Sequence, residues 1–203
     1  MKIDLFRTHN DQYRATTKPI LVEVTPARYL AVDGVGEPGG STYQEKVAAL
    51  YSVAYALKFG AKATGRDYVV AKLEGLYGID GQPASELLSI PRDQWKWRHL
   101  IRQPDFIDRG ALEEAQNGLR SKGKEGDFGA VQLVDIDEGP CVQILHIGPY
   151  ADEQPTIEAM HTFVADQKLS LHGWHHEIYL SDPRRVPPER LRTLLRHQIE
   201  SAT

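Results

Sequence analysis

The segment at 175–183, HHEIYLSDP, holds the side chains best suited to chemistry. On an extended strand His175, Glu177 and Tyr179 share one face, and the alternating residues, which include Ile178, share the face that suits the core. In an aromatic-lined cleft, burial would raise the pKa of the Glu177 carboxyl and strengthen its hydrogen bonds. Such a group can bind a cationic or donor-bearing ligand, or take a proton from water. The alternative is a solvated strand face, and spacing alone favours that alternative.

Aromatic residues are spread over both halves of the chain and suit the walls of a ligand site, because Tyr and Trp combine a rigid apolar ring with one polar tip. Tyr51 and Tyr55 lie four residues apart on an expected helix and therefore project to the same side. Trp97 follows Trp95 on an expected strand. For most of these aromatics, burial in the core is the competing interpretation, and for Trp95 it is at least as strong.

The segment LEGLYG contains Glu74 and Tyr77, a partial echo of the later Glu and Tyr pair. Their spacing differs by one residue, so both side chains share a face only if the strand is irregular. Gly75 could provide a bulge. Glu74 is then a second acidic group of the site, or else an ordinary surface residue.

Other chemistries have weaker support. Eight histidines are present, but HExxH and Cys-x-x-Cys patterns are missing, so we expect no metal site. GVGEPGG resembles a dinucleotide loop without its strand-to-helix register, and we expect no cofactor. The single cysteine, Cys141, sits in an apolar strand and is better explained as a buried structural residue than as a nucleophile.

Composition describes an ordinary globular protein. The chain has 203 residues, of which 41% are apolar and 26% charged. A net charge of −4 and a pI near 6.1 lack the Lys and Arg excess of a dedicated nucleic-acid binder. One cysteine precludes an intrachain disulfide, and no apolar run has the length of a signal peptide or membrane span. These features predict a cytoplasmic protein with no direct nucleic-acid or membrane partner.

The pattern along the chain predicts an α+β fold. We expect strands at 20–24, 28–36, 66–73, 93–101, 128–136, 141–148 and 175–183. We expect helices at 42–59, 109–120, 156–167 and 189–199, with Ser41 or Thr42 capping the first and Asp108 capping the second. Residues 1–18 are a polar lead-in, and residues 19–203 form one domain. Two strand-helix-strand-strand units, at about 19–107 and 127–203, suggest an internal duplication that gives an antiparallel sheet with helices on one face.

Several of these segments together resemble one family. LEGLYG, QWKWRHLIRQPDFI, EGPCVQILHIGPYADEQPTI and HHEIYLSDPRR with the following PERLRTLLR are similar to the GyrI-like small-molecule-binding proteins. KPILVEVTPARYLAVDGVGEPGG and ALYSVAYALKFG extend the similarity over nearly the whole chain. One departure is Tyr77, which stands where the family usually has Trp, so the size and polarity of that wall differ.

The resemblance implies two repeats related by a pseudo-twofold axis, with a ligand groove between them. It also implies an acidic ligand-contacting residue at Glu177, as in drug-sensing regulators. Some stand-alone members look like hydrolases that open cyclopropane rings in genotoxic, DNA-alkylating compounds. Only about eighteen polar residues precede the first strand, so we do not expect a helix-turn-helix domain before it.

Three functional hypotheses follow. The first is a protein that binds and sequesters bulky apolar or aromatic compounds. The second is a hydrolase at the same site, in which Glu177 activates water and Tyr179 stabilises developing negative charge. The third, a gyrase-inhibiting or gyrase-protecting protein, rests on the family name. The ligand-contacting candidates are Tyr51, Tyr55, Glu74, Tyr77, Trp97, His146 and Tyr150; the oligomeric state does not follow from the sequence.

Overall fold

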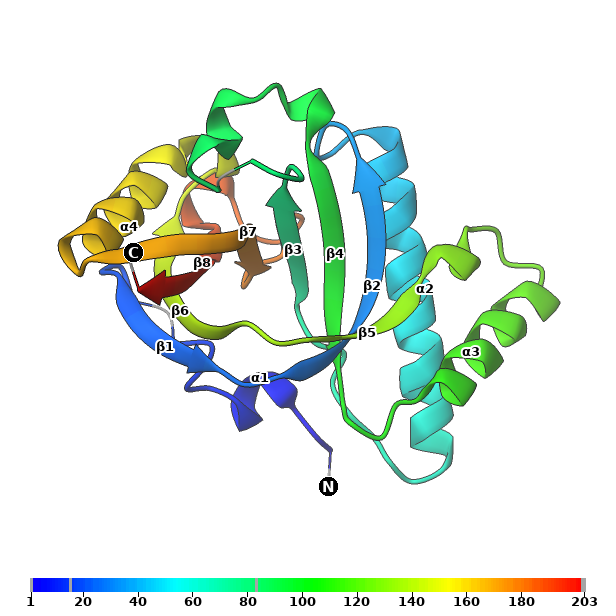
Figure 1. Ribbon diagram of the computed structural model, residues 1–203. Coiled ribbons are helices and arrows are strands. Elements are labelled where there is room, and N and C mark those ends of the chain that lie inside the picture. The colour runs from blue at the N-terminus through cyan, green and yellow to red at the C-terminus, as the bar shows by residue number, and fades with distance from the viewer. Residues whose placement is uncertain (1, 15, 83, 202–203) are drawn as a thin grey trace.

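The computed structural model describes residues 2–14, 16–82 and 84–201, and its centre is one antiparallel sheet (Figure 1). Eight strands take the order β1-β6-β8-β7-β3-β4-β2-β5. Their bounds are β1 Ile20–Val24, β2 Ala27–Val35, β3 Leu73–Gly78, β4 Lys96–Gln103, β5 Gln132–Ile136, β6 Gly139–Ile147, β7 Leu169–Tyr179 and β8 Arg192–Ser201. The central pair is β3 and β7, so residues of the two halves meet side by side there.

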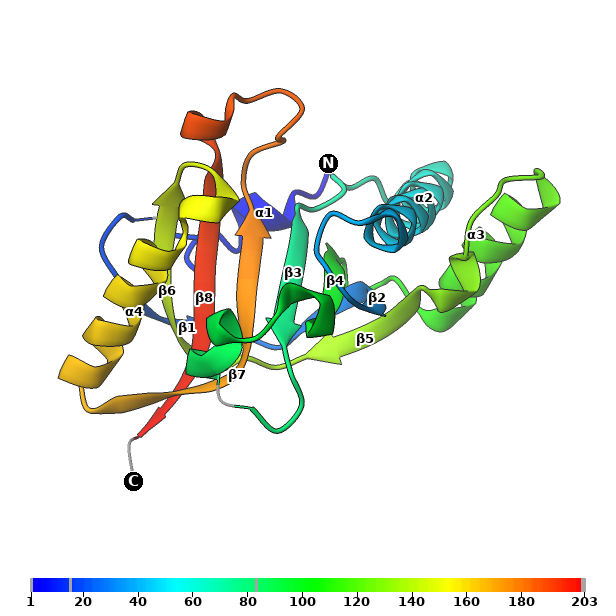
Figure 2. The same cartoon turned by 90° about the horizontal axis from the view of Figure 1, so that it is seen from above.

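Four α-helices accompany the sheet. They are α1 Leu5–Thr8, α2 Ser41–Ala63, α3 Arg109–Ser121 and α4 Gln154–Asp166. One core forms where α2 and α3 pack on the first half of the sheet, and a second forms where α4 packs on the other half. In the view from above, α4 lies to the left of strands β8, β7 and β3, and α2 lies to their right (Figure 2). The short helices are η1 Ala84–Ser89, η2 Arg92–Gln94, η3 Phe128–Ala130, η4 Tyr150–Asp152 and η5 Pro188–Arg190.

The two halves repeat one arrangement. In chain order β2-α2-β3-β4 is followed by β6-α4-β7-β8, and in the sheet β3-β4-β2 runs outward on one side as β7-β8-β6 does on the other. The predicted α+β class, with duplicated units and an antiparallel sheet, is confirmed. This topology places β3 and β7 between α2 and α4, so the side chains on the helix-covered face of these two strands meet there.

The predicted helix at 189–199 is wrong, because this segment is the strand β8. It pairs with β6 on one side and β7 on the other, and Leu194, Leu195 and Arg196 are almost fully buried. Because β8 is covered on both faces, its sequence lacks the alternation of buried apolar and exposed polar residues that identifies a half-buried strand, and its pattern resembles that of a buried helix. Only η5 at Pro188–Arg190 retains helical geometry.

Three local predictions also need correction. The strand expected at 66–73 begins at Leu73, and before it only Tyr68 forms an isolated bridge, to Ile3. Gly75 does not make a bulge; the irregularity lies in β7, between His172 and His176. The first long helix is preceded by Gly40 at its N-cap and has no side-chain cap, whereas Asp108 caps α3 as expected, accepting from the Ala111 amide at 2.9 Å.

The N-terminal segment is part of the packed structure. Tyr13 and Phe6 stack on each other and pack against Ile178 and Leu194. Ile178 is on the face of β7 opposite Glu177, so this segment covers the face of the sheet that α2 and α4 leave open. None of the helices in the described part of the chain has the length and apolar character needed to cross a membrane.

Candidate functional site

A chain of three phenols ends on the Glu177 carboxylate between the two halves. The Tyr179 hydroxyl donates to Glu177 Oε2 at 2.8 Å, and it lies 2.6 Å from the Tyr77 hydroxyl, which is 3.2 Å from the Tyr43 hydroxyl. A phenol has one proton, so Tyr77 must donate to Tyr179, and Tyr43 to Tyr77. All three hydrogen bonds therefore point toward the carboxylate and reinforce one another. We call this group, Tyr43, Tyr77, Tyr179 and Glu177, the central site.

Regular strand geometry brings these residues together. Glu177 and Tyr179 alternate on β7 and so share a face, and in the register of the central pair Gly75 lies opposite Glu177. A Cβ at Gly75 would lie 2.9 Å from the Tyr77 ring. Because Gly75 has no side chain, the Tyr77 ring leans over its own strand and reaches Tyr179.

Burial controls the charge state of the phenols. The Glu177 side chain retains only 13% exposure. Burial, followed by the nearby Glu177 charge, raises the pKa of Tyr77 and of Tyr179 well above the ordinary value. Burial also raises the pKa of Tyr43. The phenols therefore remain neutral hydrogen-bond donors beside the Glu177 carboxyl group.

An aromatic wall extends the central site toward β4. Tyr43 lies edge-on to Trp97 and to His99, with ring centroids 5.2 and 4.4 Å apart. A Cβ at Gly34 would overlap the Trp97 indole, so the absence of a side chain there lets the indole lie against β2. Within the part of the chain that the structure describes, both ring nitrogens of His99 are buried without a side-chain hydrogen-bond partner, and burial lowers the pKa of His99 to about 4. This wall therefore presents a neutral imidazole with unused hydrogen-bonding capacity.

The opposite wall comes from the segment before α4. Tyr150 lies edge-on to Tyr179 with ring centroids 5.8 Å apart. Next to it, Glu153 is 6% exposed, and its Oε1 has no hydrogen-bond partner among the described residues. Burial first, and then the Glu177 charge, raise the pKa of Glu153 to about 9. A second carboxyl, at the residue before α4, therefore lies near the central site.

Histidines line the floor beyond Glu177. His175 Nε2 lies 3.6 Å from Glu177 Oε1, and the His175 ring is 5.3 Å from that of His197. His197 is buried, which, together with His175, lowers its pKa to about 3. His175 is thus the group nearest to Glu177 on the side away from Tyr179. Within the described residues, no group of three or more His, Cys, Asp or Glu side chains is arranged to hold a metal ion.

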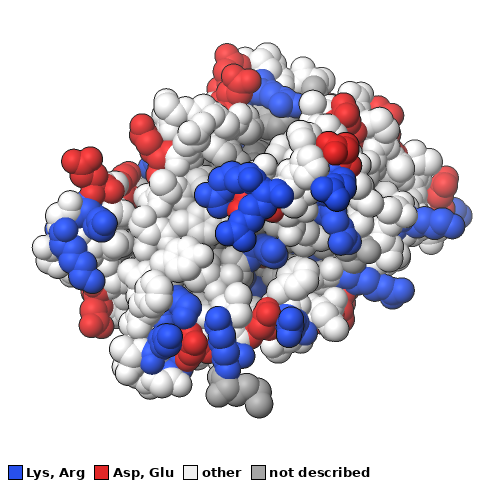
Figure 3. Space-filling view, turned by 180° about the vertical axis from the view of Figure 1, so that it is seen from behind, with Lys and Arg blue, Asp and Glu red and all other residues white. Residues whose placement is uncertain are grey.

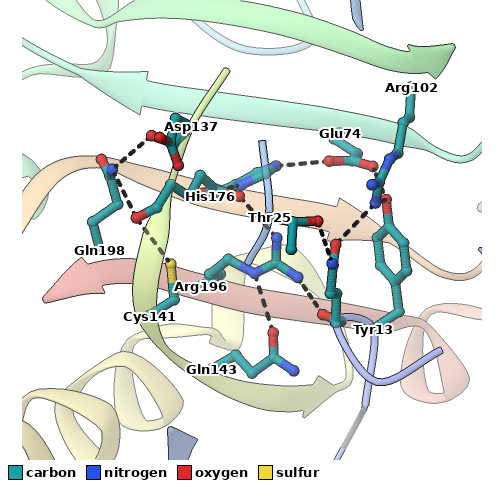
Figure 4. A network of polar contacts seen from close by, with 12 residues as sticks. Tyr13, Thr25, Glu74, Arg102, Asp137, Cys141, Gln143, His176, Arg196 and Gln198 are labelled. Carbon is teal, nitrogen blue, oxygen red and sulfur yellow. Dashed lines mark hydrogen bonds and ion pairs between the residues drawn. The ribbon is translucent and has the colours of Figure 1, made fainter. Parts of the chain in front are cut away.

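Glu74 lies on the other face of the sheet and takes part in a buried ionic network (Figure 4). Its carboxylate is held by the Tyr13 hydroxyl at 3.1 Å and by His176 Nε2 at 3.0 Å. His176 Nδ1 reaches Glu138 at 2.8 Å, and Glu138 also binds Arg196 at 2.8 Å. The alternation along β3 that puts Tyr77 in the central site sends Glu74 to the opposite face.

Burial and the neighbouring charges together determine the charge states of His176 and Glu138 in this network. Burial alone would lower the pKa of His176, but Glu138 and Glu74 outweigh it and raise that pKa to about 9. Burial would raise the pKa of Glu138, but His176 and Arg196 lower it to about 2. The Arg196 guanidinium also donates to the Gln12 carbonyl. The network therefore ties the N-terminal segment to both halves of the sheet.

Three further candidates do not contact Glu177. His146 is bonded by its two ring nitrogens to Thr156, at 2.9 Å, and to the Pro149 carbonyl, at 3.1 Å. It therefore holds the turn that carries Tyr150 and Glu153. Tyr51 and Tyr55 stack along α2, with ring centroids 6.4 Å apart, and Tyr55 is 48% exposed.

Several residues of the site were not among the sequence candidates. Period-two alternation from Trp97 reaches His99, and the stripe of Tyr51 and Tyr55 at four-residue spacing extends back to Tyr43. The sequence therefore contained a pattern that could have identified His99 and Tyr43. It contained none for Glu153, because an acidic residue just before a helix is also expected from the helix dipole alone.

Two surface hollows lie away from the central site. One, of about 660 Å³, lies along β1 and includes Leu21 and Phe163; another, of about 350 Å³, includes His146 and Pro155. Glu177 lines neither of these two hollows. One face also gathers Lys and Arg near its middle, although the net charge is −4 (Figure 3).

The fold and the site define an α+β small-molecule-binding domain built from two repeats. A family model described as the GyrI-like small molecule binding domain matches residues 121–199, the segment with α4, β7 and β8. An uncharacterised conserved protein from Listeria innocua is 37% identical, with 98% of this chain and 100% of that chain covered and a TM-score of 0.90. A hydrolase from Listeria innocua is 36% identical over the same shares, with a TM-score of 0.88. The chain therefore belongs to the GyrI-like family.

More distant similarity concerns the fold only. The C-terminal domain of EcmrR is 13% identical, with 91% of this chain and 98% of that domain covered and a TM-score of 0.63. Comparison with curated protein sequences gives no significant match.

Proposed function

We propose that the central site binds bulky apolar or aromatic compounds that place a positive charge or a hydrogen-bond donor against Glu177. The observation that carries this proposal is the buried carboxylate at the end of the Tyr43–Tyr77–Tyr179 hydroxyl chain. The carboxylate selects for charge, while Trp97 and Tyr150 offer apolar area on the two sides.

Binding has to open the site. Leu87 of η1 packs with Tyr77, Trp95 and Trp97, and thereby closes the end of the central site near β4. A bulky ligand displaces these contacts, so Leu87 moves away from Tyr77 and Trp97 when the ligand enters.

Isothermal titration calorimetry with tetraphenylphosphonium and tetraphenylborate tests the proposal, because the two ions share a shape and differ in charge. The wild type should prefer the cation, and Glu177→Gln should weaken cation binding at least about tenfold. Glu158→Gln, which removes an exposed carboxylate from α4, is the matched control and should bind like the wild type. Equal affinity of the wild type and Glu177→Gln for the cation would reject the role of Glu177.

The finer proposal is hydrolysis of cyclopropane-bearing genotoxins at the same site. It is supported by the relatives from Listeria innocua that are named as hydrolases, and by a carboxylate able to take a proton from water beside the donor Tyr179. Ring strain lowers the demand on the catalyst. The alternative is sequestration without turnover.

Mass spectrometry separates turnover from sequestration. A cyclopropane-bearing alkylating compound is incubated with the wild type and with Glu177→Gln. A product heavier by one water, formed by the wild type and lost in the variant, supports hydrolysis, whereas unchanged compound with retained binding rejects it. A supercoiling assay tests the third hypothesis, and an unchanged gyrase rate at micromolar protein would reject it.

A further inference from the structure

The outer side of α2 lacks the charged residues that a solvated helix face usually carries. In Figures 1 and 2, α2 lies at the periphery of the molecule, and it packs inward on β2, β4 and α3. Between Lys46 and Lys62 its sequence holds a single charged residue, Lys58. The Lys58 side chain is only 12% exposed and is paired with Asp67 at 2.7 Å. About four turns of α2, all within the described chain, therefore face outward without a solvated charge.

The neighbouring helix α3 shows the composition expected of a helix with one side in water. Its exposed positions include Arg109, Glu113, Glu114 and Arg120, while Leu112 is buried. In contrast, α2 buries its inner side in the first core and is apolar on its outer side as well. A helix that is apolar on all sides is normally covered on all sides.

The outward face of α2 is defined by six exposed or half-buried residues, which we call the outer stripe: Ala48, Ser52, Tyr55, Ala56, Phe59 and Ala63. Spacings of three and four residues place them in one sector of the helix. Tyr55 is 48% exposed and Phe59 is 59% exposed, and their rings stack with centroids 6.3 Å apart. The Ser52 hydroxyl donates to the Ala48 carbonyl at 2.8 Å, so it does not require water. A contiguous exposed apolar surface of this kind marks a protein–protein contact.

The order of side-chain sizes along the outer stripe fits a second copy of the same stripe. We consider two antiparallel α2 helices with a twofold axis beside Tyr55 and Ala56. Phe59 of one copy then faces Ser52 of the other, Tyr55 faces Ala56, and the alanines at the two ends of the stripe face each other. Each ring meets a small side chain, which lets the two helices pack closely. In a parallel pair, by contrast, rings would meet rings.

The charges at the ends of the outer stripe favour the same orientation. Glu45 is exposed near its start and Lys62 near its end. Antiparallel packing brings the acidic end of one helix near the basic end of the other and opposes the two helix dipoles, whereas parallel packing brings like charges together. A contact that uses the same patch on both copies closes at two chains.

We propose that α2 is the dimerisation helix of this protein, and that the outer stripes of two copies pack antiparallel about a twofold axis. Tyr43 lies on the inner side of α2, against Trp97, so each copy keeps its own central site. One helix from each copy gives an interface at the small end of specific contacts, so the dissociation constant should lie at roughly 1–100 µM.

Sedimentation equilibrium at rising protein concentration measures this association. The mass of the wild type should rise from the 22.8 kDa of one chain toward twice that value. Phe59→Glu places a charge in the apolar contact and should weaken dimerisation at least about tenfold. The fold should tolerate this change, because the Phe59 ring is already 59% exposed. Leu21→Glu makes the same kind of change at a residue of β1 that is 48% exposed, and this matched control should dimerise like the wild type.

Thiol cross-linking with a short bismaleimide determines the orientation of the two helices. Ala56→Cys lies beside the twofold axis and should cross-link to itself. Ala48→Cys should not, because its two thiols lie about 22 Å apart along the helix axis, but it should cross-link to Ala63→Cys when the two variants are mixed. The native Cys141 is buried and should not react.

The outcomes decide the inference without reference to the proposed binding or hydrolysis. A wild type that stays monomeric up to about 300 µM, above the expected dissociation constant, overturns it. A dimer that Phe59→Glu leaves intact overturns it as well, and one that Leu21→Glu disrupts places the contact at the edge strand β1 instead. Cross-linking of Ala48→Cys to itself would overturn the antiparallel arrangement.

Discussion

Replacing Glu153 by glutamine should stabilise the protein at neutral pH. In the folded protein the carboxyl is 6% exposed and its pKa is raised to about 9, whereas in the unfolded chain it titrates near 4.5. Folding at pH 7 must therefore take up a proton. Since pH 7 lies about 2.5 pH units above the ordinary value, this uptake costs about 3 kcal/mol at about 1.4 kcal/mol per unit. Glutamine is neutral in both states and avoids that cost.

The sign follows from proton binding. The folded state binds more protons than the unfolded state between pH 4.5 and 9, so wild-type stability falls across that window as pH rises. The advantage of Glu153→Gln should be absent near pH 4, about 3 kcal/mol at pH 7, and larger at pH 8. Urea denaturation at these three pH values measures it.

Glu158→Gln removes an exposed acid of the same helix and should stay within about 0.5 kcal/mol of the wild type at every pH. If Glu153→Gln were no more stable at pH 7 than the wild type, or if its advantage did not change with pH, Glu153 would not be a desolvated neutral acid.

Other perturbations test the rest of the structure. Glu138→Gln leaves Arg196 and His176 buried without their shared carboxylate and should lower the free energy of unfolding by about 3–5 kcal/mol, measured by urea denaturation. Gly34→Ala forces a methyl group into the Trp97 indole and should cost about 1–3 kcal/mol, with a changed tryptophan fluorescence spectrum. Tyr179→Phe breaks the hydroxyl chain at Glu177 and should weaken tetraphenylphosphonium binding in calorimetry, while an unchanged affinity would separate the chain from binding.

Alternation on β7 was enough to place Glu177 and Tyr179 on one face, because the strand is regular between His176 and Tyr179. The same rule sends Glu74 and Tyr77 to opposite faces, and a bulge at Gly75 was the predicted way to bring them together. In the structure Gly75 instead makes room for the Tyr77 ring, which leans back over its own strand. Whether a glycine forms a bulge or makes room for a ring depends on this contact, which the strand pattern alone does not contain.

Pairing with strands far away in the sequence determines the structure of the last segment, which its local pattern predicts wrongly. The segment PERLRTLLRHQI has a helical period, but β6 and β7 leave a position in the sheet that only a strand can fill. The buried charges of this strand are satisfied by Glu138 and Gln12, which are far away in the sequence. A prediction from the sequence of this segment alone cannot include those partners.

Glu153 shows a similar limit at the site. Its sequence context, a glycine and proline turn before a helix, predicts a solvated acid. Burial in the folded protein first, and then the nearby Glu177 charge, make its charged form unfavourable, and neither is visible in the local sequence. His146 contributes by fixing the turn through Thr156 and Pro149.

A crystal structure of the protein with tetraphenylphosphonium bound tests the role of Glu177 directly. The cation should lie between α2 and α4, with its phenyl rings against Trp97 and Tyr150, its charge next to the Glu177 carboxylate, and Leu87 displaced from Tyr77 and Trp97. A cation seated in the hollow along β1, with Glu177 still covered by its phenols, would contradict it.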